Sequence, residues 1–198
     1  MIDNRPYTFN ISLPSGIPNR FELYVFRSLK SMNGQYLDQA AYDARLAKED
    51  TLLYEVYELS RPEVAGELIH GISIVHPGLV GNEYFMTKGH FHTVLDTAEI
   101  YYVLQGNGKM VLETLDGDWA VEDLTPGKIL YVPPKWAHRS VNTSLEQDLI
   151  TFFAYPGNAG HDYGTIESQG YRKLILHENG KPIIVDNPRW QKPARRNH

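Results

Sequence analysis

Two histidines and a glutamate stand close together near the middle of the chain, in the stretch TKGHFHTVLDTAEIYYVLQGNG. His90 and His92 are separated by one residue, and Glu99 follows on an apolar run that ends at a Gly-Asn-Gly turn. Neutral imidazoles and carboxylates are ligands that first-row divalent metals accept. These three residues are therefore either ordinary strand residues or three ligands of one metal.

A fourth candidate ligand lies further along the chain. His138 follows a Pro-Gly turn, a short apolar run and a Pro-Pro pair that restricts the backbone. Three imidazoles and one carboxylate suit Fe²⁺, Mn²⁺, Ni²⁺, Zn²⁺ or Co²⁺ and leave coordination positions open, which is typical of catalytic sites. An isolated His-x-His on a strand is usually ordinary, but the agreement of four elements favours one divalent metal.

The spacing of the first three residues restricts how they can meet. Alternate residues of a strand face the same side, so His90 and His92 share a face. Glu99 is an odd number of residues from His92 and would face the other way on one continuous strand. The sequence TVLDTA can turn the chain instead. We therefore expect Glu99 on the neighbouring antiparallel strand, where Cβ atoms lie about 5 Å apart.

The elements that must position these residues are mainly short strands. After residue 50, β-branched or aromatic runs such as EYFMTKGHFH follow one another at about ten-residue spacing, each bounded by Gly, Pro, Asn or Asp. This pattern predicts an all-β sandwich or barrel. The other expected elements are an irregular arm over residues 1–20, a strand over Arg20–Leu29, a helix over Leu37–Asp50 with Asp38 as N-cap, and a hairpin over Tyr171–Asp186 turning at Asn179-Gly180.

Length and composition limit the other possibilities. The 198 residues suit a single domain, with residues 1–50 as arm and helix and residues 51–190 as the barrel core. The absence of cysteine excludes disulfides and thiolate metal sites. The net charge of −5 argues against a nucleic-acid partner, and no apolar run reaches the ~18 residues of a membrane span. Because the start lacks a signal-peptide pattern, we expect a cytoplasmic location.

The candidate ligands fall in two motifs that resemble those of the cupin superfamily. The first motif corresponds to His90, His92, Glu99 and Gly106, with a gap before the glutamate that is longer than the usual pattern. The second corresponds to Gly127, Pro133, His138 and Asn142, with Lys135 in place of a glycine, so we expect that turn to be built differently. The resemblance implies an all-β cupin fold, a double-stranded β-helix or jelly-roll barrel, over the single domain 1–198.

Both departures are shared by one family. The segments YEVY, FMTKGHFH, AEIYYVLQGNG, YVPPKWAHRSVN, YPGNAGHDYGTI and VDNPRW resemble the cupin-type phosphoglucose isomerases, known chiefly from archaea. The resemblance extends from about Leu52 to Trp190. It implies a homodimer that interconverts glucose 6-phosphate and fructose 6-phosphate with one divalent metal per subunit, for which Fe²⁺ is expected.

The resemblance also implies residue roles. The implied metal ligands are His90, His92, Glu99 and His138. The implied catalytic residues are Glu99, Tyr101 and His161, and the implied substrate contacts are Tyr54, Ser73, Thr87, Gly89, Tyr155, His161 and Tyr163. Lys88 in TKGH could bind phosphate or could be a solvated side chain, and the role of the DNPRW segment is open.

Two chemical routes and two other functions remain open from the sequence. Isomerisation can proceed by proton transfer through a cis-enediolate, with Glu99 as base, or by a metal-assisted hydride shift between C2 and C1. A carboxylate bound to a cation is a weak base, so the sequence does not choose between the routes. The alternative functions are an Fe(II) dioxygenase on the same ligands and a non-catalytic cupin that binds sugar phosphates.

Overall fold

The computed structural model describes residues 5–59 and 62–191, and residues 1–4, 60–61 and 192–198 of the predicted domain lie outside this part. Strands dominate the described residues, so the predicted all-β class is confirmed. No helix among them is long and apolar enough to cross a membrane. The elements are β1 (Ile11–Ser12), β2 (Ile17–Pro18), β3 (Leu23–Ser28), a 3₁₀ helix η1 (Leu29–Met32), α1 (Gln39–Leu46), β4 (Leu52–Leu59), β5 (Leu68–Val75), β6 (Leu79–Val80), β7 (Glu83–Tyr84), β8 (Glu99–Gln105), β9 (Gly108–Thr114), β10 (Trp119–Leu124), β11 (Ile129–Val132), β12 (Trp136–Asn142), β13 (Leu149–Pro156), α2 (Gly164–Gln169), β14 (Lys173–Glu178) and β15 (Lys181–Asp186).

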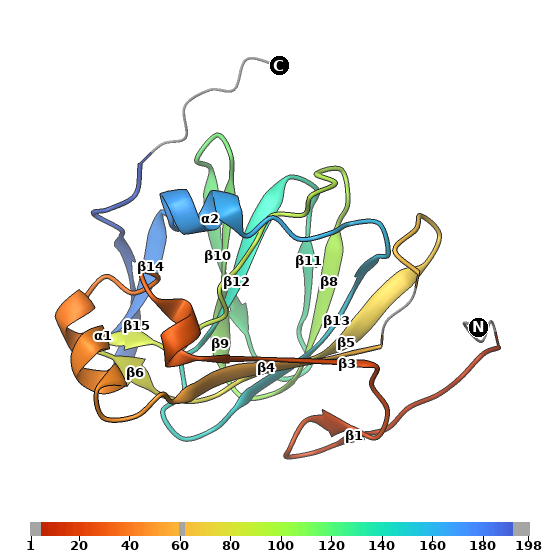
Figure 1. Ribbon diagram of the computed structural model, residues 1–198, viewed down its shortest axis with the longest axis horizontal. Coiled ribbons are helices and arrows are strands. Elements are labelled where there is room, and N and C mark those ends of the chain that lie inside the picture. Colours follow the sequence, from red (N-terminus) through yellow and green to blue (C-terminus); the bar gives the residue numbers. More distant parts are fainter. Residues whose placement is uncertain (1–4, 60–61, 192–198) are drawn as a thin grey trace.

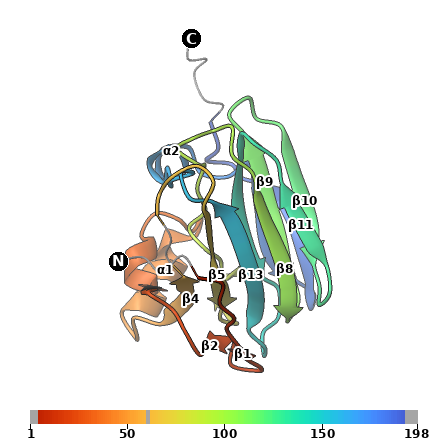
Figure 2. The ribbon, with the colours of Figure 1, turned by 90° about the vertical axis from the view of Figure 1, so that its right-hand side faces the viewer.

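The described strands form four sheets, including a four-stranded sheet of order β15-β14-β7-β6 and the short β1-β2 pair, and the two sheets that position the site are a six-stranded and a three-stranded one. The six-stranded sheet has the order β11-β8-β13-β5-β4-β3, and the three-stranded sheet has the order β10-β9-β12. From β8 to β13 the chain passes repeatedly between these two sheets, which is the jelly-roll arrangement of a cupin (Figure 1). Hydrogen bonds between the described strands do not close into one ring, so the predicted barrel consists of packed open sheets. Figure 2 shows both helices on one side of the molecule and the β9–β10 hairpin on the other.

Strand β8 shows how alternation divides its residues between interior and surface. Glu99, Tyr101 and Val103 are buried, whereas Ile100 and Tyr102 are 40% and 41% exposed. Successive side chains of a strand point to opposite faces, so the period of two places Glu99 and Tyr101 together. Val103 packs in a core cluster with Met110 and other buried residues of the facing sheet. The polar side chains of β8 therefore point into the interior between the sheets.

Several predicted elements are confirmed. Asp38 caps α1 by accepting a hydrogen bond from the Ala41 amide at 2.9 Å. Strand β3 lies within the predicted first strand, and β14 and β15 form the predicted last hairpin. Its turn residues Asn179 and Gly180 have φ values of 49° and 76°, as a two-residue type I′ turn requires.

Other elements differ from the prediction. The run EYFMTKGHFH is a regular strand only over β7, and its remainder forms isolated bridges. The N-terminal arm contains the short β1–β2 pair, and α2 was not predicted. These elements are too short for a periodic sequence pattern to reveal them.

The turn before β12 is the one where the sequence has Lys135 in place of a glycine. Lys135 adopts φ +73°, so a lysine occupies the left-handed conformation that a glycine would adopt there without strain. Its amide donates a hydrogen bond to the Leu95 carbonyl at 2.8 Å. The turn therefore contains a lysine in a conformation that glycine favours. Tertiary contacts hold a conformation that costs a non-glycine residue about 1–2 kcal/mol.

Candidate active site

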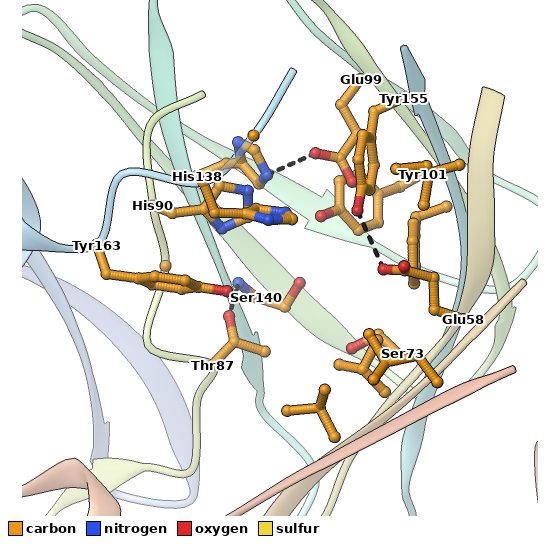
Figure 3. Close-up of a pocket in the computed structure, with 18 of the residues that line it drawn as sticks. Glu58, Ser73, Thr87, His90, Glu99, Tyr101, His138, Ser140, Tyr155 and Tyr163 are labelled. Atoms are coloured by element: carbon orange, nitrogen blue, oxygen red, sulfur yellow. Dashed lines mark hydrogen bonds and ion pairs between the residues drawn. The ribbon is translucent and has the colours of Figure 1, made fainter. Parts of the chain in front are cut away.

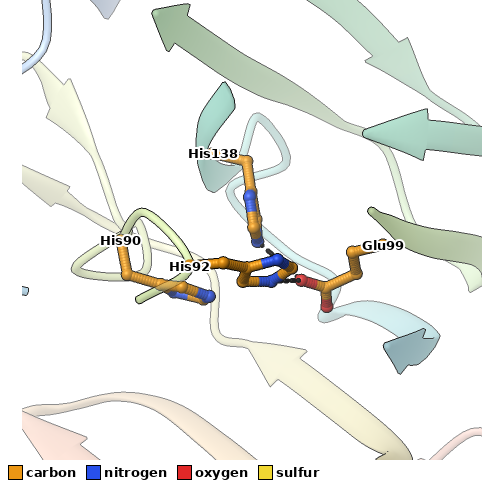
Figure 4. Close-up of side chains that lie close together, drawn as sticks. All are labelled: His90, His92, Glu99 and His138. Carbon is orange, nitrogen blue, oxygen red and sulfur yellow. Dashed lines mark hydrogen bonds and ion pairs between the residues drawn. The ribbon is translucent and has the colours of Figure 1, made fainter. Parts of the chain in front are cut away.

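Four side chains of the two sequence motifs converge in the interior. His90 and His92 come from the segment after β7, Glu99 begins β8, and His138 lies on β12. One nitrogen or oxygen atom of each residue lies within 4.8 Å of those of the others, and Figure 4 shows the side chains pointing toward one another. Glu99 Oε2 is 2.9 Å from His138 Nε2 and 3.2 Å from His92 Nε2. This separation of donor atoms fits a single metal ion.

The route by which Glu99 reaches the histidines differs from the prediction. His90 bridges His138 through backbone hydrogen bonds of 3.3 Å and 3.1 Å, so the histidine segment lies beside β12. Glu99 pairs instead with Val132 of β11, in the six-stranded sheet. The predicted placement on neighbouring antiparallel strands is therefore wrong. The turn at Val94 carries the chain from one sheet to the other, so Glu99 meets the histidines across the interior.

The cluster leaves buried polar atoms without partners. His92, Glu99 and His138 are 5%, 3% and 2% exposed. Nε2 of His90 and Nδ1 of His138 have no hydrogen-bond partner, and Nε2 of His138 has only the ion-pair contact with Glu99. Buried polar groups are nearly always paired, and a divalent cation would take the lone pair of one ring nitrogen from each histidine. The residues present thus fit a metal ion.

Protonation in this environment favours metal binding. Burial, and then the repulsion that His138 and His161 exert when they are protonated, hold the pKa of His90 well below its usual range, so its imidazole is neutral at neutral pH. Burial alone would raise the pKa of Glu99, but the neighbouring His138 and His92 outweigh it and the pKa is lowered. The site therefore offers an ionised carboxylate and a neutral imidazole, which are the forms that bind metals.

A contact outside the cluster orients one of the histidines. Nδ1 of His92 lies 3.2 Å from the carbonyl oxygen of Thr97 and 2.9 Å from its hydroxyl. With Nδ1 donating to this carbonyl, Nε2 would be the nitrogen that binds a metal ion, as in many metal sites where a second interaction fixes the tautomer.

A cavity of about 250 Å³ opens beside the cluster. Alternate residues of the surrounding strands line it, for example Tyr54, Val56 and Glu58 on β4. In Figure 3, His90, His138 and Glu99 lie at one end and Thr87 and Ser73 at the other. The cavity thus has a metal-type end, where Tyr101 and Tyr155 lie beside Glu99, and a hydroxyl end.

The sequence is similar to known proteins along most of its length. The family model for glucose-6-phosphate isomerase (GPI) matches residues 26–192. The chain belongs to this family. A glucose-6-phosphate isomerase of Thermococcus litoralis is 41% identical over 94% of this chain and 97% of its own length, and that of Thermococcus kodakarensis is 45% identical with the same coverage. A solved oxalate oxidase shares 16% identity, covering 50% of this chain and 47% of its own, with a TM-score of 0.41.

In this glucose-6-phosphate isomerase family member, all the residues expected to contact substrate lie around the one cavity. They are Tyr54, Ser73, Thr87, Gly89, Tyr155, His161 and Tyr163, and the expected catalytic Tyr101 lines it too. Burial and the nearby Glu99 carboxylate raise the pKa of Tyr101 well above its usual range, so its hydroxyl stays protonated and can donate. Burial likewise raises the pKa of Tyr163 to about 12.

His161 is carried by the loop between β13 and α2. Its ring lies between those of His90, at 4.2 Å, and Tyr155, at 5.3 Å. His161 is exposed as a residue, but the rings around its imidazole desolvate it and lower its pKa to about 4, so it is neutral at neutral pH and offers one donor and one acceptor. A neutral imidazole beside the metal-type end can bind hydroxyl groups without adding charge.

Three charged residues that line the cavity, Arg27, Glu58 and Glu63, were missed by the sequence interpretation. Among the described residues that line it, Arg27 on β3 is the one cation, and Glu58 on β4 accepts a hydrogen bond from the Tyr155 hydroxyl at 3.1 Å. The two-residue period of a strand places Leu23 and Arg27 on the same face of β3, and this could be read from the sequence. Only the fold shows that this face lines the cavity. Lys88 does not line the cavity, and its ammonium pairs with Glu167 of α2.

Proposed function

We propose that this protein interconverts D-glucose 6-phosphate and D-fructose 6-phosphate in glycolysis and gluconeogenesis, with a divalent metal ion at His90, His92, Glu99 and His138. The observation that carries the proposal is the cavity with a metal-type cluster at one end and hydroxyl groups at the other. A sugar phosphate has its carbonyl carbon and its phosphate at opposite ends. Family membership supports the same activity.

The two ends of the cavity suit the two ends of the substrate. We place C1 and C2 beside Glu99 and the phosphate near Thr87, Ser73, Gly89 and Arg27. Hydroxyl groups, a free amide and a guanidinium are donors that bind phosphate. The charge of Arg27 acts on both Tyr54 and Tyr163, which places it at the same cavity.

The proposed chemistry assigns proton handling to the chain. A bound divalent ion would supply Lewis acidity at O1 and O2. Glu99 is ionised and accepts a proton, either from C2 in the enediolate route or from a substrate hydroxyl in the hydride-shift route. Tyr101 and neutral His161 donate hydrogen bonds to substrate oxygens. Turnover in D₂O separates the routes, because only proton transfer through the solvent introduces deuterium at the product carbon.

Three further features belong to the proposal. We propose iron as the native ion, supported by a donor set of imidazoles and a carboxylate that suits first-row metals. We propose a single cupin domain and a cytoplasmic homodimer. The dimer is supported by exposed apolar side chains on the outer face of β3, at the edge of the six-stranded sheet, where Tyr24 and Phe26 are 42% and 56% exposed.

The direct test is conversion of fructose 6-phosphate to glucose 6-phosphate by purified protein loaded with Fe²⁺, Mn²⁺ or Ni²⁺. We expect turnover with at least one of these ions. Oxygen uptake and calorimetric binding of fructose 6-phosphate are measured in parallel, because a dioxygenase would consume oxygen and a sensor would bind without turnover. No isomerisation with any loaded ion would refute the proposed activity.

Replacement of Arg27 by glutamine is expected to raise the KM for fructose 6-phosphate about 10-fold with little change in kcat. The reason is the loss of a charge-assisted contact with the phosphate, which is bound equally in the ground and transition states. Arg20→Gln is the matched control, because Arg20 pairs with Glu22 outside the cavity. An unchanged KM in Arg27→Gln would remove Arg27 from phosphate binding.

A further inference from the structure

The backbone bulges where the TKGH segment runs beside β12. Met86 bridges Val141, whereas His90 bridges His138, so the register changes by one residue between the two bridges. Two hydrogen bonds fix Thr87 to Ser140. The Thr87 amide donates to the Ser140 carbonyl at 2.9 Å, and the Ser140 amide donates to the Thr87 hydroxyl at 3.1 Å. Lys88 and Gly89 are therefore the arched part of a β-bulge, a device that re-aims groups beside active sites.

Arg139 holds this arch from behind. Its Nε and Nη2 both donate to the Lys88 carbonyl oxygen, at 3.2 Å and 2.7 Å. Nη2 also donates to Gln35 Oε1 at 2.7 Å, and the guanidinium stacks on the Tyr171 ring at 4.5 Å. Arg139 is 3% exposed and does not line the catalytic cavity. The Arg139 guanidinium is thus buried, contacts neutral partners, and donates two hydrogen bonds to the Lys88–Gly89 peptide group.

The contact between Arg139 and the Lys88 carbonyl also sets the direction of the Gly89 N–H. In a trans peptide the C=O and N–H point in opposite directions. Because the Lys88 carbonyl points to Arg139, outside the cavity, the Gly89 N–H points toward the cavity that Gly89 lines. No protein acceptor takes this N–H among the described residues. A cation on the carbonyl also polarises the peptide and strengthens its N–H as a donor.

Gly89 itself shows how tightly the arch is held. Its φ of +76° is a left-handed conformation, and a Cβ placed there would lie 2.9 Å from the His138 carbonyl oxygen. Tyr171, which supports Arg139, is tied in turn to the C-terminal DNPRW segment, since Asn187 Nδ2 donates to the Tyr171 carbonyl at 2.8 Å. This segment therefore supports the arch through Tyr171.

We propose that Arg139 is a positioning residue for phosphate binding, which acts by holding the Lys88–Gly89 peptide so that the Gly89 amide faces the substrate phosphate. The inference rests on the proposed function in naming a sugar phosphate as the ligand. The metal half of the site is held differently, because His90 is fixed by its own backbone bridge to His138. Loss of Arg139 should therefore affect phosphate binding and spare metal binding.

The test compares Arg139→Gln and Arg139→Lys with the wild-type protein. We expect the KM for fructose 6-phosphate and the Kd for 6-phosphogluconate to rise about 10-fold in Arg139→Gln, with kcat and metal content unchanged. Arg139→Lys should recover part of the loss, since an ammonium can donate to the carbonyl but not as a fork. Arg20→Gln is the control, because Arg20 pairs with Glu22 away from both the cavity and the arch.

A second measurement separates this inference from the proposed activity. In the zinc-loaded protein, titration with inorganic phosphate should shift the Gly89 amide resonance in a ¹⁵N–¹H spectrum, and this shift should be weakened in both Arg139 variants. If the shift depends on Arg139 but no isomerisation occurs, the positioning role stands and the proposed activity fails. Three results for folded Arg139→Gln would overturn the positioning role. They are a wild-type KM, a Gly89 resonance that phosphate shifts as much as in the wild-type protein, and a loss of both kcat and bound metal.

Discussion

Replacing Glu99 with glutamine is expected to lower kcat by about 10²–10⁴-fold, the range for removal of a group that transfers a proton. The amide is nearly isosteric with the carboxylate but carries no charge and cannot accept a proton. Glu99 is also the one carboxylate of the metal-type cluster, so metal affinity should fall as well. The measurement is kcat at saturating metal, which separates the loss of proton transfer from the loss of the ion.

The control for Glu99 is a second buried carboxylate outside the cavity. Glu113 on β9 is fully buried and accepts hydrogen bonds from the Arg172 amide and from Trp190 Nε1, each at 2.5 Å. Glu113→Gln should lower the thermal midpoint and leave kcat of the folded protein near the wild-type value. Turnover of Glu99→Gln within a few-fold of wild type at saturating metal would exclude Glu99 as the proton-transfer group.

Removal of the metal by a chelator is expected to abolish turnover and to lower the stability of the fold. Three imidazoles and a carboxylate would then be left close together in a buried site, with unpaired ring nitrogens. A ligand present at 100 to 1,000 times its Kd stabilises the folded state by about 3–4 kcal/mol. We therefore expect thermal unfolding of the chelated protein at lower temperature, and recovery of both properties when a divalent ion is returned.

Two histidine variants give this experiment its specificity. His138→Ala should bind metal weakly and respond little to added ion. His76→Ala should behave like wild type, because His76 lies outside the cluster and its ring nitrogens contact Asp148 and Glu55. Full turnover in protein shown by elemental analysis to be free of metal would contradict the proposed metal dependence.

Local chemistry made much of the fold and site predictable. The alternation in β8 follows from the two-residue period of a strand, so the sequence places Glu99 and Tyr101 on one face. The N-cap at Asp38 and the turn at Asn179-Gly180 follow from preferences that act over a few residues. The motif spacing likewise singled out the four residues whose ligand atoms the structure brings within 4.8 Å.

Other features depend on which segments lie opposite each other. The odd spacing from His92 to Glu99 required a turn, but only the sheet order shows that the turn crosses to the facing sheet. Arg27 is far from the other cavity residues in sequence, and its face of β3 is internal only because β3 joins the six-stranded sheet beside β4. No local pattern encodes such pairings.

The sequence by itself determined which residues can bind a metal and which strand faces they occupy, because residue type and the two-residue period are local properties. Only the tertiary structure decided that Glu99 meets the histidines across the interior, that Arg27 enters the cavity, and that Arg139 lies behind the Lys88–Gly89 peptide. These are contacts between distant segments, set by the packing of two sheets around one core. The contact partners of these side chains are therefore set by the whole fold and not by the residues next to them in the sequence.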